Sequence, residues 1–459
     1  MERLALPATL LTVALGVLIM AQFIAIPLSS GEARENLATA LTPTESFVPE
    51  DEGADGLAGI EQLDARSGLV DYNALDWQII GLMEDPQMVG LAVAVVENGE
   101  TVFARGYGET LVDTGEPVTI DTVFRWASLS KGVAATMVAM LAGDGAIDMN
   151  APLSRYVPSM RLPGAAQLQA TVRDMLSHRL GIERHGHDMR LERDEDPYVL
   201  RGALAGYPYA CPPGTCHRYQ NVGFDGASEL VEGVTGQSYE AATRERLLAP
   251  LGMTSVTMSR RGLWESASWA RSHNRSREEV PVVLPYYRIP AAGGVNGSIR
   301  DMARWIEAQL GEAPDVLPRA ILATVQTPVV RTEREDRRNR RYAGRIGNTY
   351  YALGWRVYDY AGHRVIAHRG AVRGYRAMIM FDPVRRSGVA ILSNSDSGRP
   401  FTIPMAVFDQ LYGLPEADWI EGSGAPGGAA TPGPAIPGGP PMIEGRRRPG
   451  DIHSSESGR

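Results

Sequence analysis

Two blocks of strand-forming sequence, separated by a long stretch of helical pattern, constrain the fold of this chain more than any other feature. The first block, residues 91–103, contains an Asn98-Gly99 pair between two apolar runs, which is a strong signal for a β-hairpin. The second block alternates apolar runs with the turn signals Ala361-Gly362 and Asp382-Pro383, so it predicts a meander. The strands expected in this block are residues 350–360, 364–368, 375–381 and 388–393.

The sequence between the two blocks predicts mainly helices and loops, because its apolar residues recur at helical spacing. The expected helices include residues 129–142, 171–178, 226–233 and 299–306, and a last amphipathic helix lies near 403–411. An early hairpin and a late meander can share one antiparallel sheet. We therefore predict an α+β fold, in which an antiparallel sheet is flanked by helices and a mainly helical lobe is inserted between its two halves. A binding site is then expected between the lobe and the sheet.

Composition divides the 459 residues into four segments. Residues 1–30 are predicted to be a signal peptide or a membrane anchor, because the run from Leu4 to Ser30 is uncharged and mostly apolar, and both alternatives stay open. Residues 31–70 are acidic and predict a flexible linker. Residues 414–459 are rich in Pro and Gly and predict a disordered tail. Residues 71–413 form the predicted folded domain.

The N-terminal run leads us to expect an exported protein, either periplasmic or anchored in the inner membrane and facing the periplasm. The net charge is −9, and no basic stripe with interleaved aromatic residues is present, which excludes a general nucleic-acid binder. A small-molecule or peptide-like substrate is the expected partner of the pocket.

Lys131 is the only lysine in a chain with 45 Lys plus Arg residues. Such a chain has no general use for lysine, so this position is expected to need a group that can lose its proton, which arginine cannot do. Ser128 lies three residues earlier, at the start of an expected helix, and positions i and i+3 share a helix face. Ser128 and Lys131 are therefore a candidate nucleophile and base at the positive end of a helix. The alternative is a surface lysine with a serine nearby by chance.

Tyr219 and Asn221 form a second candidate element, because residues two apart in an extended segment point the same way. A phenol close to a lysine loses its proton more readily than a free one, so Tyr219 is a candidate proton shuttle. Asn221 is a candidate ligand for a substrate amide carbonyl. The alternative is a buried tyrosine that only supports a loop.

His368, Gly370 and Ala371 form a third candidate element at the end of an expected strand. His368 and Gly370 share one face of this strand, and Gly370 is expected to leave open the space that a side chain would take from the substrate. The backbone N–H of Ala371 and that of Ser128 are candidate donors of a two-donor oxyanion hole. The alternative is a histidine that is fully hydrogen-bonded at a strand end.

The three elements together resemble the motifs of the penicillin-recognising serine hydrolases, which include class C β-lactamases, D-alanyl-D-alanine carboxypeptidases, D-aminopeptidases and related esterases. Ser-x-x-Lys, Tyr-x-Asn and His-x-Gly follow one another in the family order. Three further segments are also similar to sequence segments of this family: Val172–Gly181, Leu248–Met253 and Ala291–Ser298. The resemblance covers residues 75–414.

The resemblance implies that Ser128 forms an acyl-enzyme and that Lys131 and Tyr219 share the role of base. It implies that the amides of Ser128 and Ala371 stabilise the tetrahedral intermediate and that Asn221 positions the substrate. Class C β-lactamases have lysine where this chain has His368, which is less permanently cationic. The resemblance therefore favours an esterase, D-peptidase or carboxypeptidase acting on a small ester or peptide-like amide. The alternatives are a non-catalytic module that binds peptidoglycan-like ligands, and a β-lactamase.

Cys211 and Cys216 are the only cysteines, and their nearness in an exported chain favours a disulfide that stiffens the loop before Tyr219. Two reduced thiols are the alternative. The run His185-Gly-His187-Asp188 lacks the spacing of metallo-hydrolase motifs, so we expect a charged loop there and no metal. No cofactor is expected.

Overall fold

The computed structural model describes residues 68–342 and 344–420. The predicted leader, most of the predicted acidic linker and residues 421–459 of the predicted tail lie outside the described residues. Among the helices of the described part, none has the length and apolar character needed to cross a bilayer.

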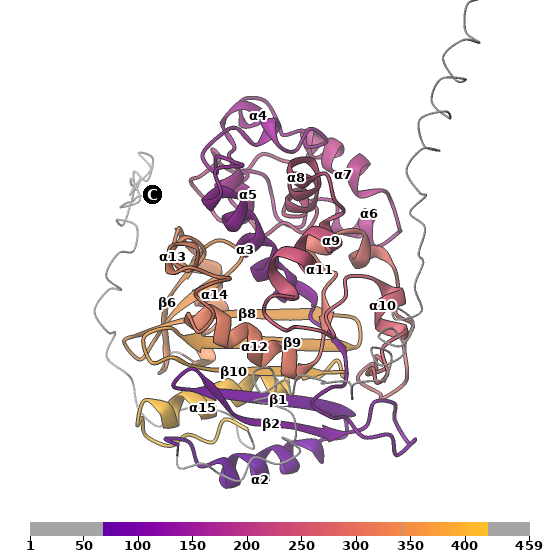
Figure 1. The fold of residues 1–459 in the computed structure, drawn as a ribbon, viewed down its shortest axis with the longest axis vertical. Coiled ribbons are helices and arrows are strands. Elements are labelled where there is room, and N and C mark those ends of the chain that lie inside the picture. Colours follow the sequence, from indigo (N-terminus) through magenta and orange to yellow (C-terminus); the bar gives the residue numbers. More distant parts are fainter. Residues whose placement is uncertain (1–67, 343, 421–459) are drawn as a thin grey trace, which may run out of the picture. The chain divides into compact units, whose positions relative to one another are not determined.

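An eight-stranded antiparallel sheet is the centre of the fold (Figure 1). Its strand order is β2-β1-β10-β9-β8-β7-β6-β5, so the first hairpin pairs with β10, the last strand in the described residues. This pairing confirms the prediction that the early hairpin and the late meander share one sheet. The strands are β1 Gly90–Glu97, β2 Glu100–Gly108, β5 Val330–Arg331, β6 Ile346–Tyr351, β7 Arg356–Tyr360, β8 His363–Val372, β9 Tyr375–Asp382 and β10 Ser387–Ser393, while β3 Phe124–Arg125 and β4 Asn296–Gly297 form a separate pair.

Two tight turns have the left-handed backbone that their sequences predict. Asn98 and Gly99 have φ angles of 56° and 89°, and Ala361 and Gly362 have φ angles of 50° and 88°. Positive φ at both central residues is the geometry of a type I′ hairpin turn, which matches the twist of the flanking strands. The turn residues therefore fix the registers of β1 with β2 and of β7 with β8.

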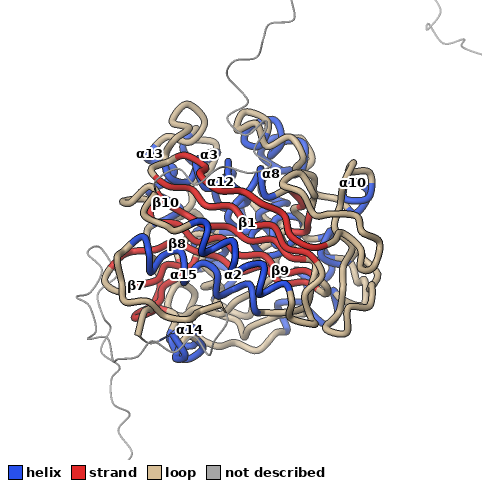
Figure 2. Tube along the Cα trace, turned by 90° about the horizontal axis from the view of Figure 1, so that it is seen from below, coloured by secondary structure: helices blue, strands red, loops and turns tan. Residues whose placement is uncertain are grey.

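Helices cover both faces of the sheet. Alternate residues of β1 belong to different cores: Leu91, Val93 and Val95 pack with α2 and α15, whereas Ala92, Ala94 and Val96 face the helical lobe. Figure 2 shows α2 and α15 lying across the face that is turned away from the lobe. The helices are α2 Tyr72–Met83, α3 Ser130–Gly143, α4 Ala166–Gln169, α5 Val172–Leu176, α6 Asp188–Leu191, α7 Pro197–Ala203, α8 Gly226–Thr235, α9 Tyr239–Thr243, α10 Arg260–Trp264, α11 Pro290–Gly293, α12 Ile299–Leu310, α13 Arg319–Gln326, α14 Glu333–Arg338 and α15 Ile403–Leu411.

The expected boundaries differ from the structure at two places. The predicted strand 350–360 is split into β6 and β7, because Gly354 adopts a φ of 74° and lies against helix α3. The predicted tail begins too early, because residues 414–420 still pack on the domain. Trp419 is 2% exposed, and its indole Nε1 donates a 2.7 Å hydrogen bond to Asp409 Oδ2.

Helix α3 is the buried axis between the sheet and the lobe. It packs against α8, α11 and α13 and has apolar or small residues on every side, which is typical of a helix enclosed by protein. Its fit against the sheet is close: a Cβ at Gly132 would lie 2.5 Å from the Trp355 ring, and one at Gly354 would overlap the carbonyl oxygen of Lys131. The backbone of Lys131 is therefore fixed by contacts from the sheet.

We expect Gly354→Ala to lower the free energy of unfolding by at least ~2 kcal/mol, because the new methyl group meets the Lys131 backbone and the residue keeps a positive φ. Urea unfolding followed by circular dichroism measures this change. Gly236→Ala is the matched control: its φ is 71°, but nothing lies within 4 Å of the added atom, so about 1 kcal/mol is expected. Equal losses in the two variants would contradict the close contact.

Candidate active site

Ser128 lies in a tight turn immediately before α3. The turn is a 3-10 segment, η1, Ala127–Leu129, and Ala127 adopts a left-handed φ of 50°. Such a backbone at a non-glycine residue is strained, so the surrounding structure must hold it. Ser130 Oγ supports the turn: it donates to the Ala127 carbonyl at 2.6 Å and accepts from Val295 N–H at 3.0 Å. Ser128 itself is only partly buried, between two buried neighbours.

The side chain of Lys131 is completely buried, and oxygen atoms surround its amine. Nζ donates to the Ala292 carbonyl at 2.7 Å and to Asn221 Oδ1 at 2.9 Å, and it lies 3.4 Å from Ser128 Oγ. None of the carboxylates in residues 68–342 and 344–420 forms an ion pair with it. A neutral amine has two hydrogens and one lone pair, so the two near acceptors can take the hydrogens and leave the lone pair to Ser128.

Tyr219 approaches Ser128 from the lobe. Its hydroxyl donates a 3.0 Å hydrogen bond to Ser128 Oγ, and Lys131 Nζ lies 4.8 Å from the centre of its ring. The structure thus brings together Ser128, Lys131 and Tyr219, three residues that the sequence singled out from two separate segments. Both candidate bases are within reach of the same hydroxyl, so the geometry leaves the choice between them open.

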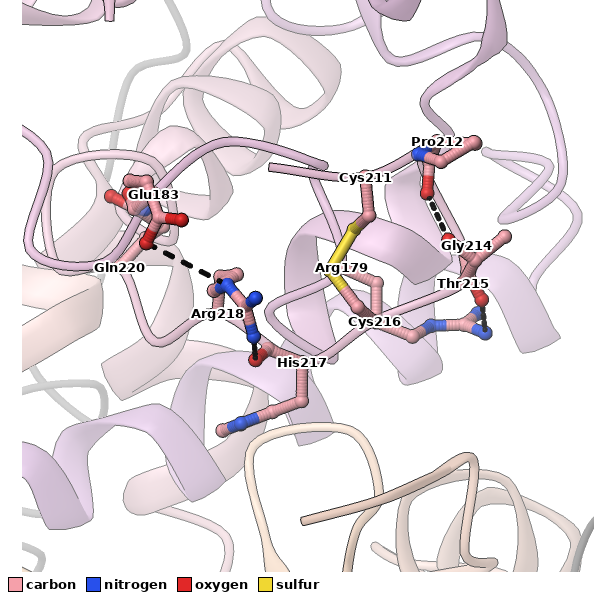
Figure 3. The surroundings of a disulfide bond; sticks show 10 residues. All are labelled: Arg179, Glu183, Cys211, Pro212, Gly214, Thr215, Cys216, His217, Arg218 and Gln220. Carbon is pink, nitrogen blue, oxygen red and sulfur yellow. Dashed lines mark hydrogen bonds and ion pairs between the residues drawn. A yellow bond between two sulfur atoms is a disulfide. The ribbon is translucent and has the colours of Figure 1, made fainter. Parts of the chain in front are cut away.

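The loop that carries Tyr219 is held on both sides by His178. The carbonyl of His178 accepts from Arg218 N–H at 2.7 Å, and its Nδ1 accepts from Gln220 N–H at 3.1 Å. Figure 3 shows the disulfide between Cys211 and Cys216, which closes the segment just before this loop. Sequence patterns alone do not identify His178, because its contacts depend on the folded loop.

Asn221 is 8% exposed and lies between Lys131 and the loop that begins α6. Its Oδ1 accepts from Lys131, and its Nδ2 donates to Asp188 Oδ2 at 2.8 Å. His185 Nδ1 lies 2.9 Å from the same carboxylate oxygen. Asn221 was predicted to bind a substrate amide carbonyl. In the structure, one hydrogen of its side-chain amide already donates to Asp188.

Gly370 has a packing role in addition to the one expected. A Cβ at this position would overlap the carbonyl oxygen of Trp126 and lie 3.3 Å from the Ala127 side chain. Gly370 therefore lets β8 pack directly on the turn that carries Ser128, and it does not simply leave room for a substrate. The next residue, Ala371, is exposed beside this contact. This arrangement favours the predicted pairing of the Ser128 and Ala371 amides as an oxyanion hole.

His368 lies outside the hydrogen-bonded group around Ser128, in contrast to its predicted catalytic place. It is 1% exposed, and its Nδ1 donates to the Arg369 carbonyl at 2.9 Å, so Nε2 accepts from the Tyr351 hydroxyl at 3.1 Å. Burial, and then the charges of Arg356 and Lys131, hold the pKa of His368 well below its usual value. The environment fits a neutral, fully hydrogen-bonded histidine inside the strand.

A cavity of about 590 Å³ adjoins Ala371. Arg125, Arg373 and Arg376 line it together with Tyr286, and so do the carboxylates of Glu192 and Asp396. Arg376 is paired with Asp396 at 2.8 Å, but Arg125 is 3% exposed and has no carboxylate partner among the described residues. The guanidinium of Arg125 lies over the ring of Tyr287, 4.2 Å from its centre. The lining thus has three arginines and two carboxylates, and Asp396 is already paired with Arg376.

Metal-binding residues do not gather in the described part of the chain, where no group of three or more His, Cys, Asp or Glu side chains is placed to hold an ion. His185 and Asp188, which the sequence set aside as a charged loop, form the contacts to Asn221 described above. The other missed contributor is the Ala292 carbonyl, a backbone group that no side-chain motif can reveal.

Comparison with known proteins identifies the class. The family described as Beta-lactamase matches residues 75–413, so the chain belongs to the β-lactamase family of serine hydrolases. The fold agrees with this assignment: the octameric penicillin-binding protein homologue from Pyrococcus abyssi is similar over 75% of this chain and 78% of its own, with a TM-score of 0.67 and 23% identity.

Curated relatives share a modest part of the sequence. The unguisins hydrolase of Aspergillus campestris is 28% identical over 323 residues, which cover 67% of this chain but only 58% of the relative. Penicillin-binding protein 4 of Amycolatopsis lactamdurans is 27% identical over 361 residues, 74% of this chain and 90% of the relative. The chain thus spans little more than half of the first of these relatives and nearly all of the second.

We expect Ser128→Ala to reduce turnover at least ~10³-fold without a change in melting temperature, because it removes the nucleophile and little buried surface. Lys131→Arg should lower kcat to a similar degree, because arginine cannot accept a proton at this position. Steady-state ester hydrolysis and thermal unfolding measure both effects. A fully active Lys131→Arg enzyme would show that Lys131 supplies only positive charge.

His217 lies next to His178 and Tyr351. We expect it to make the free energy of unfolding depend on pH. Burial and nearby arginines lower its pKa to about 3, whereas the unfolded chain has the ordinary value near 6.5. Protonation of His217 therefore favours the unfolded chain. Well above pH 6.5 the residue does not lower the free energy of unfolding. As the pH falls from 6.5 toward 3, it lowers this free energy by up to ~1.4 kcal/mol per pH unit.

We expect His217→Gln to lose less stability than the wild type between pH 7 and pH 5. Urea unfolding at the two pH values measures the difference, and the wild type should show the additional loss of ~2 kcal/mol that integration over this range gives. Equal losses in both proteins would mean that His217 takes up protons equally in the folded and unfolded states, which contradicts the lowered pKa.

Proposed function

We propose that this protein hydrolyses a small ester or peptide-like amide through an acyl-enzyme on Ser128. The observation that carries the proposal is the placement of Ser128 Oγ, 3.0 Å from the Tyr219 hydroxyl and 3.4 Å from the amine of the only lysine. A partly exposed serine beside a buried amine that has no ion-pair partner among the described residues, and within hydrogen-bond distance of a tyrosine hydroxyl, supports nucleophilic catalysis.

In this proposal, Ser128 Oγ attacks the carbonyl carbon of the substrate while its proton passes to Lys131 or to Tyr219. The carbonyl oxygen becomes an oxyanion that the Ser128 and Ala371 amides stabilise. Collapse of the intermediate expels the alcohol or amine, which takes up the proton, and leaves the acyl group on Ser128. Water, deprotonated by the same base, then releases the acid and restores the serine.

The cavity next to Ala371 receives a substituent of the substrate. Arg125 and Arg373 line this cavity, and neither has a carboxylate partner among the described residues. A substituent with negative charge is therefore favoured over a neutral one of the same size. Relatives named as a hydrolase and as a penicillin-binding protein support acyl transfer at the level of the family. We also propose export of the chain, on the basis of its N-terminal sequence.

The test is intact-protein mass spectrometry after incubation with a fluorophosphonate, with benzylpenicillin and with two aryl esters that differ only by a terminal carboxylate on the acyl chain. We expect a single adduct that maps to Ser128 and disappears in Ser128→Ala. Ser276→Ala, a change at an exposed loop serine, is the control and should keep the adduct.

The outcomes separate the competing functions. Repeated turnover of an ester supports the hydrolase, and a faster reaction of the carboxylated ester supports the charged subsite. A stable adduct without turnover points to the binding module. Turnover of benzylpenicillin as the best substrate points to a β-lactamase. The absence of any adduct in the folded protein would contradict acyl transfer.

A further inference from the structure

Asp188 is the one carboxylate in the described chain that touches the amide of Asn221. Its side chain is 13% exposed, and its Oδ2 accepts from Asn221 Nδ2 at 2.8 Å. The other oxygen, Oδ1, is buried without a hydrogen-bond partner. The residue follows His185 and His187, which both have left-handed backbones with φ of 55° and 62°. Strained residues thus precede a carboxylate that is only partly satisfied, although such burial is unfavourable.

The orientation of the Asn221 amide decides what Lys131 can do. With Oδ1 toward Lys131, as observed, the amide accepts one N–H of the amine, and the Ala292 carbonyl accepts another. With the amide turned over, its NH₂ group would face the amine. It would then either oppose the amine hydrogens or donate to the lone pair that Ser128 needs.

An ionised carboxylate favours only one of these orientations. It has acceptors and no donor, so it binds the NH₂ end of the Asn221 amide and disfavours its oxygen. An asparagine at 188 would fill the same space, but it could present either a donor or an acceptor. The choice of an aspartate, with one oxygen left unsatisfied, is therefore explained by the direction that it imposes.

We propose that Asp188 is a positioning residue that holds Asn221 Oδ1 on the amine of Lys131 and thereby leaves the Lys131 lone pair to Ser128. The proposal rests on the acyl-transfer function proposed above and adds a residue to it. Asp188 acts through Asn221, and its Oδ1 is buried, so we assign its effect to the chemical steps and not to substrate binding.

We expect Asp188→Asn to lower kcat about tenfold and Asp188→Ala to lower it more, since small misplacement of a catalytic group has effects of this order. KM should stay within about twofold of the wild type in both variants, because in this proposal Asp188 acts on the amine of Lys131 and not on the substrate. Asp194→Asn is the matched control. Asp194 lies in the same segment with a φ of 67°, and it pairs with Arg288 away from Ser128.

A second measurement does not depend on activity. Because Lys131 is the only lysine, protein labelled with [ε-¹³C]lysine gives one lysine signal, which reports on this amine in the full chain without assignment. We expect this signal to move in Asp188→Asn and to stay in place in Asp194→Asn. Thermal unfolding shows whether each variant folds. If Asp188→Ala does not fold, the Asp188→Asn variant alone tests the proposal.

Wild-type kcat in both Asp188 variants, or an unmoved lysine signal in Asp188→Asn, would overturn the proposal. A rise in KM with unchanged kcat would overturn it as well, because it would place Asp188 in substrate binding. Failure of the proposed function looks different: the wild type itself would not be acylated at Ser128, while the lysine signal would still report whether Asp188 controls the amine.

Discussion

The burial of Lys131 among neutral oxygens is the constraint on which the rest of the site depends. An amine that is removed from water must keep its hydrogen bonds, and here the Ala292 carbonyl and Asn221 supply them without a carboxylate. Each of these partners comes from a different part of the lobe, so the lobe has to close on α3 before the amine is satisfied. Folding of the domain and assembly of the candidate site are in this sense one event.

The sheet supplies the other half of the site through close backbone contacts. Gly370 lets β8 touch the turn before Ser128, and Gly354 lets the β6–β7 connection touch Lys131. Neither contact involves a functional side chain. Both explain why Ser128 stays in place on a strained turn. Residues of the sheet region pack against this segment on one side, and α8 and α11 pack against α3 on the other.

The parts of the fold that were predicted from the sequence are those with local signals. Turn residues and alternating strands identified the hairpin and the meander, and helical periodicity located α15. The unpredicted parts depend on tertiary contacts. The break at Gly354 reflects the nearby helix, the roles of His178 and Asp188 depend on how loops fold back, and the Ala292 carbonyl has no side-chain signal at all. Ser128, Lys131 and Tyr219 were found because their chemistry is carried by side chains in a motif, whereas His368 matched the motif and yet lies apart from the hydrogen-bonded group.

The position of His368 bears on how charge is recognised in the site. A lysine at this place in a relative would carry a permanent positive charge, whereas this histidine is buried, hydrogen-bonded on both nitrogens and held neutral. Two other cations, Arg125 and Arg373, line the cavity that adjoins Ala371. In the proposed mechanism, acyl transfer at Ser128 and recognition of a charged substituent belong to separate groups. The substrate preference could then change through the arginines without disturbing the amine of Lys131.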